Sequence, residues 1–507
     1  MGGVDRKKMH RDNWLSVLIG PFKFLVPTLS YIILYPLMIS KMSIEVVGIW
    51  SLTAAIVSFI SITDIGFSQL LVRDAGADRA KHFSEVYADY VTARRAYVLI
   101  LLILIFVILA TQKYIFAPVA EIYSTSALTA SVVLILIGAF IQLSGKLDAA
   151  ILSARHDNYI VQLVTGIAPV LTYSAMIIGT LLKRPIEGLA IGTVLTGVAT
   201  VMVYRFRLHH HHNEFVSTTS ILNLYDTIKR FFSLVRRGWH LYSCSVGMML
   251  RGPIYRFIIV TTIGLEAAAI FDIAMRVTQT VREVIATGFS VLFPSFSILF
   301  RSGERARIIE LIQVSLMVLL SLGTLTLCLL IASIAPILTL WLGSFPSETL
   351  PSTRVLAIWQ IITLANVPFW YLLQASHNER AAAYSIWAHT ALILLLIPLS
   401  STFKVEIVDL LIYWTVTSAF TQGLIYYYVH KRLSLLWDAI KSTRIVALLA
   451  LIVVFSTLSY LISPSVLEMR DLMGYFGFVA ILFTLTAAII VVKPVMQFLK
   501  AENGYAK

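Results

Sequence analysis

The amino-acid sequence predicts an all-α integral membrane fold with about 14 transmembrane helices. Three observations lead to this prediction: 58% of the 507 residues are hydrophobic, only 13% are charged, and long apolar runs recur along the whole chain. A soluble domain carries about 25% charged residues, whereas a helix that crosses the hydrocarbon layer needs about 20 apolar residues. We therefore expect lipid to be the main neighbour of the protein surface.

The apolar runs place the spans in order along the chain. The expected spans are residues 17–39, 46–72, 96–119, 128–151, 159–182, 188–206, 239–262, 267–299, 308–335, 354–375, 381–400, 408–429, 445–463 and 472–493. They divide the chain into a first lobe over 1–206, a cytoplasmic loop over 207–238, a second lobe over 239–429, and two further spans with a cytoplasmic tail over 430–507. Prolines inside several spans fit this assignment, because neighbouring helices satisfy the carbonyls that a proline leaves free.

The basic residues set the orientation. The net charge of +13 could indicate nucleic-acid binding, but the basic residues gather in alternate loops only. With the N-terminus inside, about 27 Lys and Arg residues lie on the cytoplasmic side and about 7 on the other side, which is the positive-inside pattern. We expect a protein of the bacterial inner membrane with both termini in the cytoplasm and no nucleic-acid partner.

The loop over 207–238 carries two features of its own. His209–His212 lack the Cys and His spacing of a closed zinc site, so we expect a solvated loop there and no metal. Residues 221–235 have the pattern of an amphipathic helix that lies on the membrane surface. The two cysteines, Cys244 and Cys328, lie far apart inside spans and indicate neither a disulfide nor a metal cluster.

A short repeat relates the two lobes. Residues 43–50 (SIEVVGIW) match residues 264–271 (GLEAAAIF), each with a Glu, then small residues, then an aliphatic and an aromatic residue. Six spans separate the copies, so both lobes have the same orientation in the membrane. Parallel repeats of this kind place a central cavity between two bundles at mid-membrane. We expect two six-helix lobes around such a cavity.

Charged and polar side chains at membrane depth identify the helices that line the cavity. A charge at the helix centre costs about 2.5–3.5 kcal/mol, so these groups should face water or each other. Span two has one polar face, which includes Asp64, and spans one, four, seven and eight carry the other charges. The residues are Lys23, Ser58, Ser61, Asp64, Ser68, Lys146, Asp148, Arg251, Arg256, Asp272, Arg276, Arg282 and Glu283.

These charges allow two interpretations. Six are basic and four acidic, so two positive charges remain for an anionic ligand in a cationic cavity. Alternatively, the network compensates itself: Asp272 and Arg276 stand at i and i+4 and can pair on one helix. Lys146 and Asp148 lie near the inner end of span four, where we expect their charged groups to snorkel to the interface.

The ordered motifs resemble those of the Wzx-type flippases, the polysaccharide-exporter branch of the multidrug/oligosaccharidyl-lipid/polysaccharide (MOP) superfamily. The resemblance covers nearly the whole chain and rests on residues 45–50, 63–68 with Arg73, 154–156, 255–257, 271–276, 291–294 and 341–343. It implies two six-helix lobes with alternating access, and spans thirteen and fourteen as a peripheral pair. It also implies a substrate of oligosaccharide on undecaprenyl diphosphate, moved from the cytoplasmic to the periplasmic leaflet.

From charge position we expect Arg251, Arg256 and Arg276, with Lys23 opposite, to hold the diphosphate, because the arginine fork matches a phosphate and stays charged. Ser58, Ser61, Ser68 and Arg282 are candidates for cavity and sugar contacts. No Walker-type loop is present, so Asp64 or Asp272 is the candidate for coupling to H⁺ or Na⁺. We expect no catalytic residue, metal or cofactor, and as partners membrane lipids, a polysaccharide polymerase and a chain-length regulator.

Three alternatives remain open. A multidrug exporter of the same superfamily would favour acidic and aromatic cavity residues, and a peptidoglycan-precursor flippase would share the cationic cavity. A polyprenyl-linked glycosyltransferase or polysaccharide polymerase generally needs a large outer loop with catalytic carboxylates. The longest outer loop expected here, around 336–353, has fewer than about twenty residues.

Overall fold

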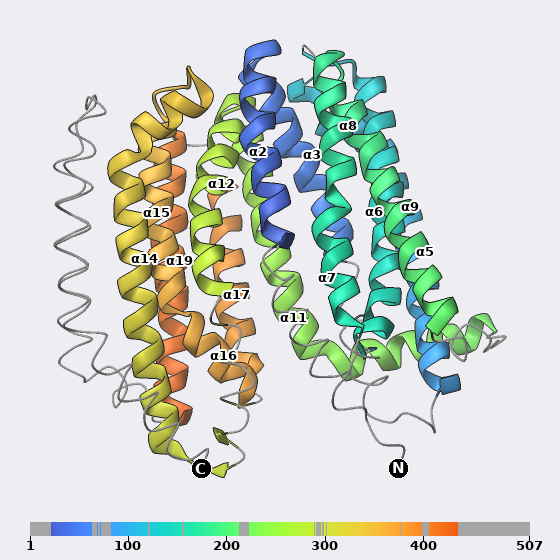
Figure 1. The fold of residues 1–507 in the computed structure, drawn as a ribbon, viewed down its shortest axis with the longest axis vertical. Coiled ribbons are helices and arrows are strands. Elements are labelled where there is room, and N and C mark those ends of the chain that lie inside the picture. The colour runs from blue at the N-terminus through green and yellow to red at the C-terminus, as the bar shows by residue number, and fades with distance from the viewer. Residues whose placement is uncertain are drawn as a thin grey trace. The chain divides into compact units, whose positions relative to one another are not determined.

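A computed structural model describes residues 22–62, 68, 71, 83–119, 122–154, 157–211, 223–287, 289, 296, 299–300, 302–376, 378–397 and 405–433. Within these residues all regular structure is helical, which confirms the predicted all-α class (Figure 1). The two predicted spans at 445–463 and 472–493 lie outside the described residues. So does His212 of the histidine run.

The chain forms two compact units, and the first covers residues Met1–Ala269. Its helices correspond to the first seven predicted spans. They are α2 (Phe22–Lys41), α3 (Ile44–Ile62), α5 (Phe83–Ile115), α6 (Thr125–Ala154), α7 (Asn158–Ile167), α8 (Pro169–Leu181), α9 (Pro185–His211) and α11 (Leu224–Thr262), with a short 3₁₀ turn, η1, at Ala117–Val119.

The fifth predicted span is interrupted at a proline. Residues 159–182 form α7 and α8, which meet at Ala168, and Pro169 is the first residue of α8. Proline has no backbone N–H, so one hydrogen bond of the continuous helix is lost at this point. Ala168 keeps right-handed helical backbone angles, and both helices pack against α2 and α9. The break is therefore local, and the two pieces together form one span.

Glycines bring three helices of this unit into backbone contact. A Cβ added at Gly188 of α9 would lie 2.4 Å from the carbonyl oxygen of Ala175 on α8, and one added at Gly138 of α6 would lie 2.7 Å from the backbone nitrogen of Val194 on α9. Small residues at helix contacts permit such approach and are the usual means of association in membranes. The backbone of α9 is therefore in close contact with those of α6 and α8.

Helix α11 joins two elements that the sequence predicts as separate. The amphipathic helix at 221–235 and the span at 239–262 form one continuous helix of 39 residues, Leu224–Thr262. Figure 1 shows its first part running across the unit before it turns up beside α3, against which it packs. Arg95 on α5 donates to the Thr227 hydroxyl at 2.7 Å, and Arg230 pairs with Asp89 at 3.3 Å. These contacts fix the crossing part to α5.

The second unit covers residues Ile270–Lys507. Its described helices are most of α12 (Leu265–Thr287), then α14 (Arg305–Leu342), α15 (Thr349–Ala365), α16 (Val367–Ala375), α17 (Glu379–Leu394) and α19 (Ile407–Tyr428), which a π-helical turn, η2 (Val429–Leu433), extends. The tenth predicted span again divides at a proline, since Pro368 stands in the first turn of α16. The units divide inside α12; the predicted lobe boundary at 239 stays a prediction.

The repeat predicted from sequence has the same local structure in both places. Two residues separate α2 from α3, and two separate α11 from α12. The copies also touch: a Cβ added at Gly48 would lie 2.1 Å from the carbonyl oxygen of Leu265. A glycine is required at position 48 because any side chain there would collide with the backbone of the second copy.

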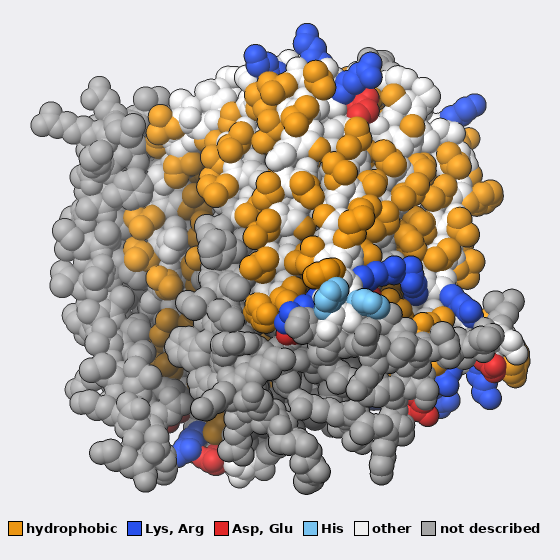
Figure 2. Space-filling model, turned by 45° about the vertical axis from the view of Figure 1, so that its right-hand side comes forward, with side chains coloured by type: hydrophobic (Ala, Val, Ile, Leu, Met, Phe, Trp, Pro, Cys, Tyr) orange, Lys and Arg blue, Asp and Glu red, His pale blue; other side chains and the backbone are white. Residues whose placement is uncertain are grey.

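The outer face of the first unit is apolar. Figure 2 shows a broad belt of hydrophobic side chains between charged groups at its upper and lower edges. Exposed apolar side chains such as Leu99, Leu102 and Phe106 on α5 contribute to this face. Among the described residues, six helical segments are long and apolar enough to cross a membrane. A protein with these properties is a multi-pass membrane protein.

Candidate substrate-binding residues

Two of the predicted diphosphate ligands lie on α11, in the first unit. Arg251 and Arg256 are both half-buried, and they flank Tyr255, which is completely buried. A Cβ added at Gly252 would lie 3.7 Å from Nη1 of Arg256, so the Arg256 guanidinium folds back along the helix over a position with no side chain. Pro253 lies between the two arginines and removes the N–H that would otherwise bond the Met249 carbonyl.

The other two predicted arginines lie on α12, in the second unit. Arg276 Nε lies 3.7 Å from Oδ2 of Asp272, one helical turn earlier. This confirms the i, i+4 pair that the sequence suggested. The Asp272 side chain is 2% exposed and that of Arg276 is 30% exposed. The carboxylate therefore lies at the base of the pair, while the guanidinium reaches toward the surface of the unit.

Arg282 has a different environment from Arg276. It is half-buried on α12, and its Nε is buried without a hydrogen bond to the described part of the chain. Glu283 and Tyr371 are the ionisable groups that interact with its guanidinium. The Glu283 carboxylate accepts a hydrogen bond from Gln279 at 2.6 Å. Arg282 is thus a cation that can offer N–H donors to an anionic ligand, and Glu283 is the carboxylate whose charge acts on it.

The predicted residues of the first two spans are described in part. The side chains of Lys23, Ser58 and Ser61 lie outside the described part of the structure, as does the whole of Asp64. Ser68 is described, and it lines a cavity of about 340 Å³ within the first unit. Of the polar face predicted for span two, this residue alone is placed against a cavity.

That cavity is rich in hydroxyl groups. Beside Ser68 its polar lining comes from α6, α7 and α9, and consists of Gln142, Lys146, Ser153, Thr165, Thr196, Thr200 and Tyr204. Lys146 is exposed and is the cation of the lining. The α9 members stand at helical spacing over residues 196–204, a polar face that an i, i+4 search of this span would find. This face was not predicted, because hydroxyl residues were considered in span two alone.

The expectation for Asp148 is wrong. Its side chain does not snorkel to the interface; it is 2% exposed, accepts a hydrogen bond from the Tyr90 hydroxyl at 2.6 Å, and lies 3.6 Å from Nε of Arg205. Tyr90 from α5 and Arg205 from α9 contact the carboxylate, and these contacts replace the water that it loses on burial. Lys146 is exposed, in agreement with the expectation for that residue.

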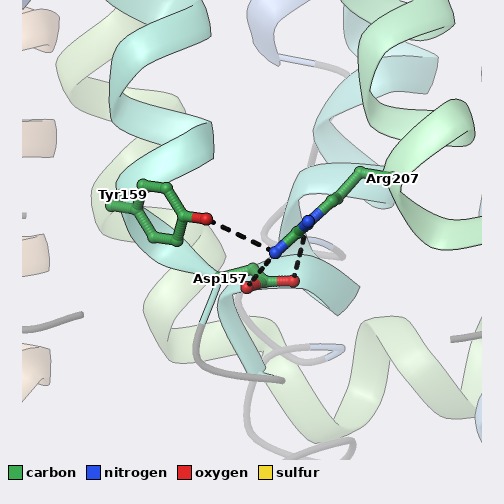
Figure 3. Close-up of polar contacts among 3 residues, drawn as sticks. All are labelled: Asp157, Tyr159 and Arg207. Carbon is green, nitrogen blue, oxygen red and sulfur yellow. Dashed lines mark hydrogen bonds and ion pairs between the residues drawn. The ribbon is translucent and has the colours of Figure 1, made fainter. Parts of the chain in front are cut away.

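A second buried carboxylate of this unit holds α9 to the loop before α7. Asp157 is 1% exposed and accepts two hydrogen bonds from Arg207, whose Nη2 also donates to the Tyr159 hydroxyl at 3.3 Å (Figure 3). No local sequence pattern indicates this pair, because 50 residues separate its members.

The second unit contains a neutral polar cluster that sequence reasoning also missed. The Trp359 indole donates to the Ser418 hydroxyl at 2.9 Å, and Gln422 donates to the same oxygen at 2.8 Å. Asn366, at the break between α15 and α16, donates to Gln422 at 2.7 Å. The cluster connects α15 and α19 inside an apolar bundle, where such bonds between helices contribute to association.

The fold is that of the MOP superfamily transporters. It resembles an inward-facing multidrug resistance MATE family transporter (TM-score 0.58, 14% identity, 84% of this chain and 96% of that chain). It resembles equally the lipid II flippase MurJ in an inward closed conformation (TM-score 0.58, 14% identity, 97% and 99%). A variant of the Vibrio cholerae MATE transporter VcmN gives a TM-score of 0.57 at 14% identity, with 84% and 98% covered.

Residues 13–300 match the family described as "Polysaccharide biosynthesis protein". The match covers more than half of the chain, so the protein belongs to this family, a polysaccharide flippase family of the MOP superfamily. The search of curated proteins gave no significant match. Family and fold are therefore those of transporters and not of catalytic enzymes.

Proposed function

We propose that the protein is a flippase for undecaprenyl-diphosphate-linked oligosaccharide units, which it moves from the cytoplasmic to the periplasmic leaflet by alternating access for surface polysaccharide synthesis such as O-antigen. The family match over residues 13–300 and the transporter fold support it. The observation that carries the substrate class is the pair Arg251 and Arg256, two half-buried guanidinium groups within one helix. The protein would lie in the inner membrane, with both termini in the cytoplasm.

The chemistry of the diphosphate accounts for the arginines. A guanidinium donates two parallel hydrogen bonds to a phosphate and stays charged when partly desolvated. In this proposal Arg251, Arg256 and Arg276 hold the diphosphate with Lys23, while Ser58, Ser61, Ser68 and Arg282 contact the sugars. The prenyl chain remains in the lipid. A polysaccharide polymerase and a chain-length regulator would use the product.

Transport in one direction needs an energy source, because alternating access alone only equilibrates the substrate. We propose that Asp272 or Asp64 binds H⁺ or Na⁺. Asp272 is the better supported of the two, because its buried carboxylate lies 3.7 Å from Arg276. Neutralising the carboxylate would release Arg276 from the pair and leave its charge available to the diphosphate.

Complementation of a deletion strain tests the proposal. Arg251→Ala and Arg256→Ala should each abolish surface glycan while the protein stays in the membrane at normal amounts. Arg236→Ala is the matched control, because Arg236 is exposed on the same helix, before the predicted span. Normal glycan display in both test variants would refute the assignment of the diphosphate site.

The likeness to MurJ favours a second candidate, a flippase for a peptidoglycan precursor. The two substrates share the prenyl diphosphate and differ in the attached group, so the same arginines would serve both. The lipid that accumulates on the inner leaflet after deletion distinguishes them: a lipid-linked oligosaccharide supports our proposal, and lipid II supports the alternative. A multidrug exporter is less consistent with the four arginines in predicted spans seven and eight, because cationic drugs would be repelled.

A further inference from the structure

A second cavity lies at the end of the first unit where α5 carries Tyr87, Tyr90 and Arg94. Its volume is about 420 Å³, and it forms a groove with α5 on one side, α9 on the other and α6, which packs against both, at the base. Its lining residues are Tyr87, Tyr90, Arg94, Asp148, Arg205, Phe206, Leu208, His209 and His210. Two of them belong to the histidine run, which continues α9 to His211 and is not a loop there.

The charges of the groove favour an anion. Its single carboxylate, Asp148, is buried at the base and already engaged by Tyr90 and Arg205. The Arg205 side chain is 47% exposed, so it both pairs with Asp148 and reaches the opening. Arg94 is exposed, and its charge also acts on Asp148, so two arginines face one carboxylate. The groove therefore carries at least one positive charge that its own carboxylate does not offset.

The histidines add further donors at the same rim. The His210 ring packs on Phe206 at 4.2 Å between centroids and its Nδ1 contacts the Phe206 carbonyl. The carbonyl oxygen can only accept, so Nδ1 carries the hydrogen of this contact, and Nε2 donates to an anion when the ring is protonated. The His209 ring lies 6.0 Å from that of His210. Two arginines and two imidazoles thus line one rim, a set that suits a phosphate with several acceptor oxygens.

The surfaces beside the groove are apolar. On α9, Met202 and Phe206 are each 65% exposed, and on α5, Leu99 and Leu102 are about 60% exposed. Figure 2 shows histidine side chains (pale blue) beside Lys and Arg side chains at the lower edge of the hydrophobic belt. A ligand that matched the whole region would have an anionic head and apolar chains. Free phosphate would use the head site alone and leave these surfaces unmatched.

We propose that this groove binds the headgroup of an anionic phospholipid, with Arg94, Arg205, His209 and His210 around the phosphate and the acyl chains along α5 and α9. The bound lipid bridges α5 and α9, which both pack against α6, and so stabilises this end of the unit. The inference depends on the membrane location of the protein and not on the substrate it transports.

Thermal unfolding of the purified full-length protein in detergent micelles tests the proposal. Titration with phosphatidylglycerol should raise Tm well above the shift given by phosphatidylcholine, and inorganic phosphate should give no comparable shift. Arg94→Gln should weaken the apparent affinity for phosphatidylglycerol about fivefold, the scale set by one basic residue near an anionic lipid. Arg94→Lys should restore most of it.

Lys113→Gln is the matched control, because Lys113 is an exposed cation on the same helix near its other end. This variant should keep the wild-type affinity. If Arg94→Gln does not fold, the double variant His209→Gln/His210→Gln provides the same test. Equal shifts with both lipids, a full effect of inorganic phosphate, or unchanged affinity in the folded test variant would each overturn the proposal. Because the readout is Tm and not glycan display, failure here is separate from failure of the proposed function.

Discussion

Arg207 on α9 holds both carboxylate oxygens of Asp157, at 3.1 and 3.2 Å, across 50 residues of sequence. The carboxylate is almost completely buried, whereas the arginine is 22% exposed. A fork of this geometry fixes the position of the loop before α7 relative to α9. The same end of the unit carries the Asp148 pair, so two buried carboxylates connect its helices there.

Removing the Asp157 carboxylate should destabilise the first unit. Asp157→Ala leaves the Arg207 guanidinium without its main partner, and we expect a loss of about 2–3 kcal/mol in the free energy of unfolding. Denaturant unfolding in detergent micelles measures it. Tyr159→Phe is the control, because it removes one hydrogen bond of 3.3 Å and should cost at most about 1 kcal/mol. Equal effects of the two changes would contradict this account.

A side chain at Gly48 should separate α3 from the start of α12. A Cβ there would lie 2.1 Å from the Leu265 carbonyl oxygen. Because this neighbour is backbone and cannot move aside as a flexible side chain would, Gly48→Ala should lower the free energy of unfolding by about 1–3 kcal/mol. Gly423→Ala is the control, since nothing lies within 4 Å of a Cβ at Gly423. That change should be neutral or slightly stabilising. A stable Gly48→Ala protein with unchanged Tm would refute the contact.

Asp272→Asn should uncouple transport from its ion gradient if Asp272 is the coupling group. The neutral amide cannot gain or lose a charge, so transport by the variant in proteoliposomes should no longer respond to a pH or Na⁺ gradient. Glu283→Gln serves as the control, because this carboxylate bonds to Gln279 on the same helix. A gradient response that persists in Asp272→Asn would assign coupling to another group, with Asp64 next to be tested.

Tyr123 connects the turn before α6 to the first turn of α9, through a short hydrogen bond to Glu187. Burial, with the hydrogen bond to Glu187, raises the pKa of the Tyr123 hydroxyl above its ordinary value. A raised pKa gives stability that is fully present below about pH 10 and is lost as the pH rises through the folded-state pKa. Tyr123→Phe should therefore lower Tm at pH 7. The difference from wild type should shrink at strongly alkaline pH, and a constant difference would contradict this.

The helical architecture followed from composition and hydrophobic runs because lipid leaves the backbone few alternatives. Each predicted span from the first to the twelfth overlaps a described helix. Two details were not predictable from apolar length: Pro169 and Pro368 divide spans five and ten, and α11 continues through the expected loop. The mean hydropathy of a sequence window does not detect the one backbone N–H that a proline removes. It also does not detect that an amphipathic helix continues without a break into a predicted span.

The candidate site was predictable only where partners are close in sequence. The Asp272–Arg276 pair lies within one helical turn, so residue spacing alone predicted it. The partners of Asp148 come from two other helices, and no local pattern in the sequence indicates them. The same holds for the bond between Trp359 and Ser418, which joins residues 59 positions apart. The roles of Arg251, Arg256 and Lys23 in binding substrate stay predictions.

The glycine contacts of α9 bear on how the first unit can move. Where backbones touch through Gly138 and Gly188, neither a lipid tail nor water fits between the helices, and sliding would drive carbonyl groups into each other. Helices α6, α8 and α9 should therefore move as one rigid body during any conformational change. Bending would then be confined to places such as the joint at Ala168 and Pro169, where a missing hydrogen bond already lowers the resistance to flexing.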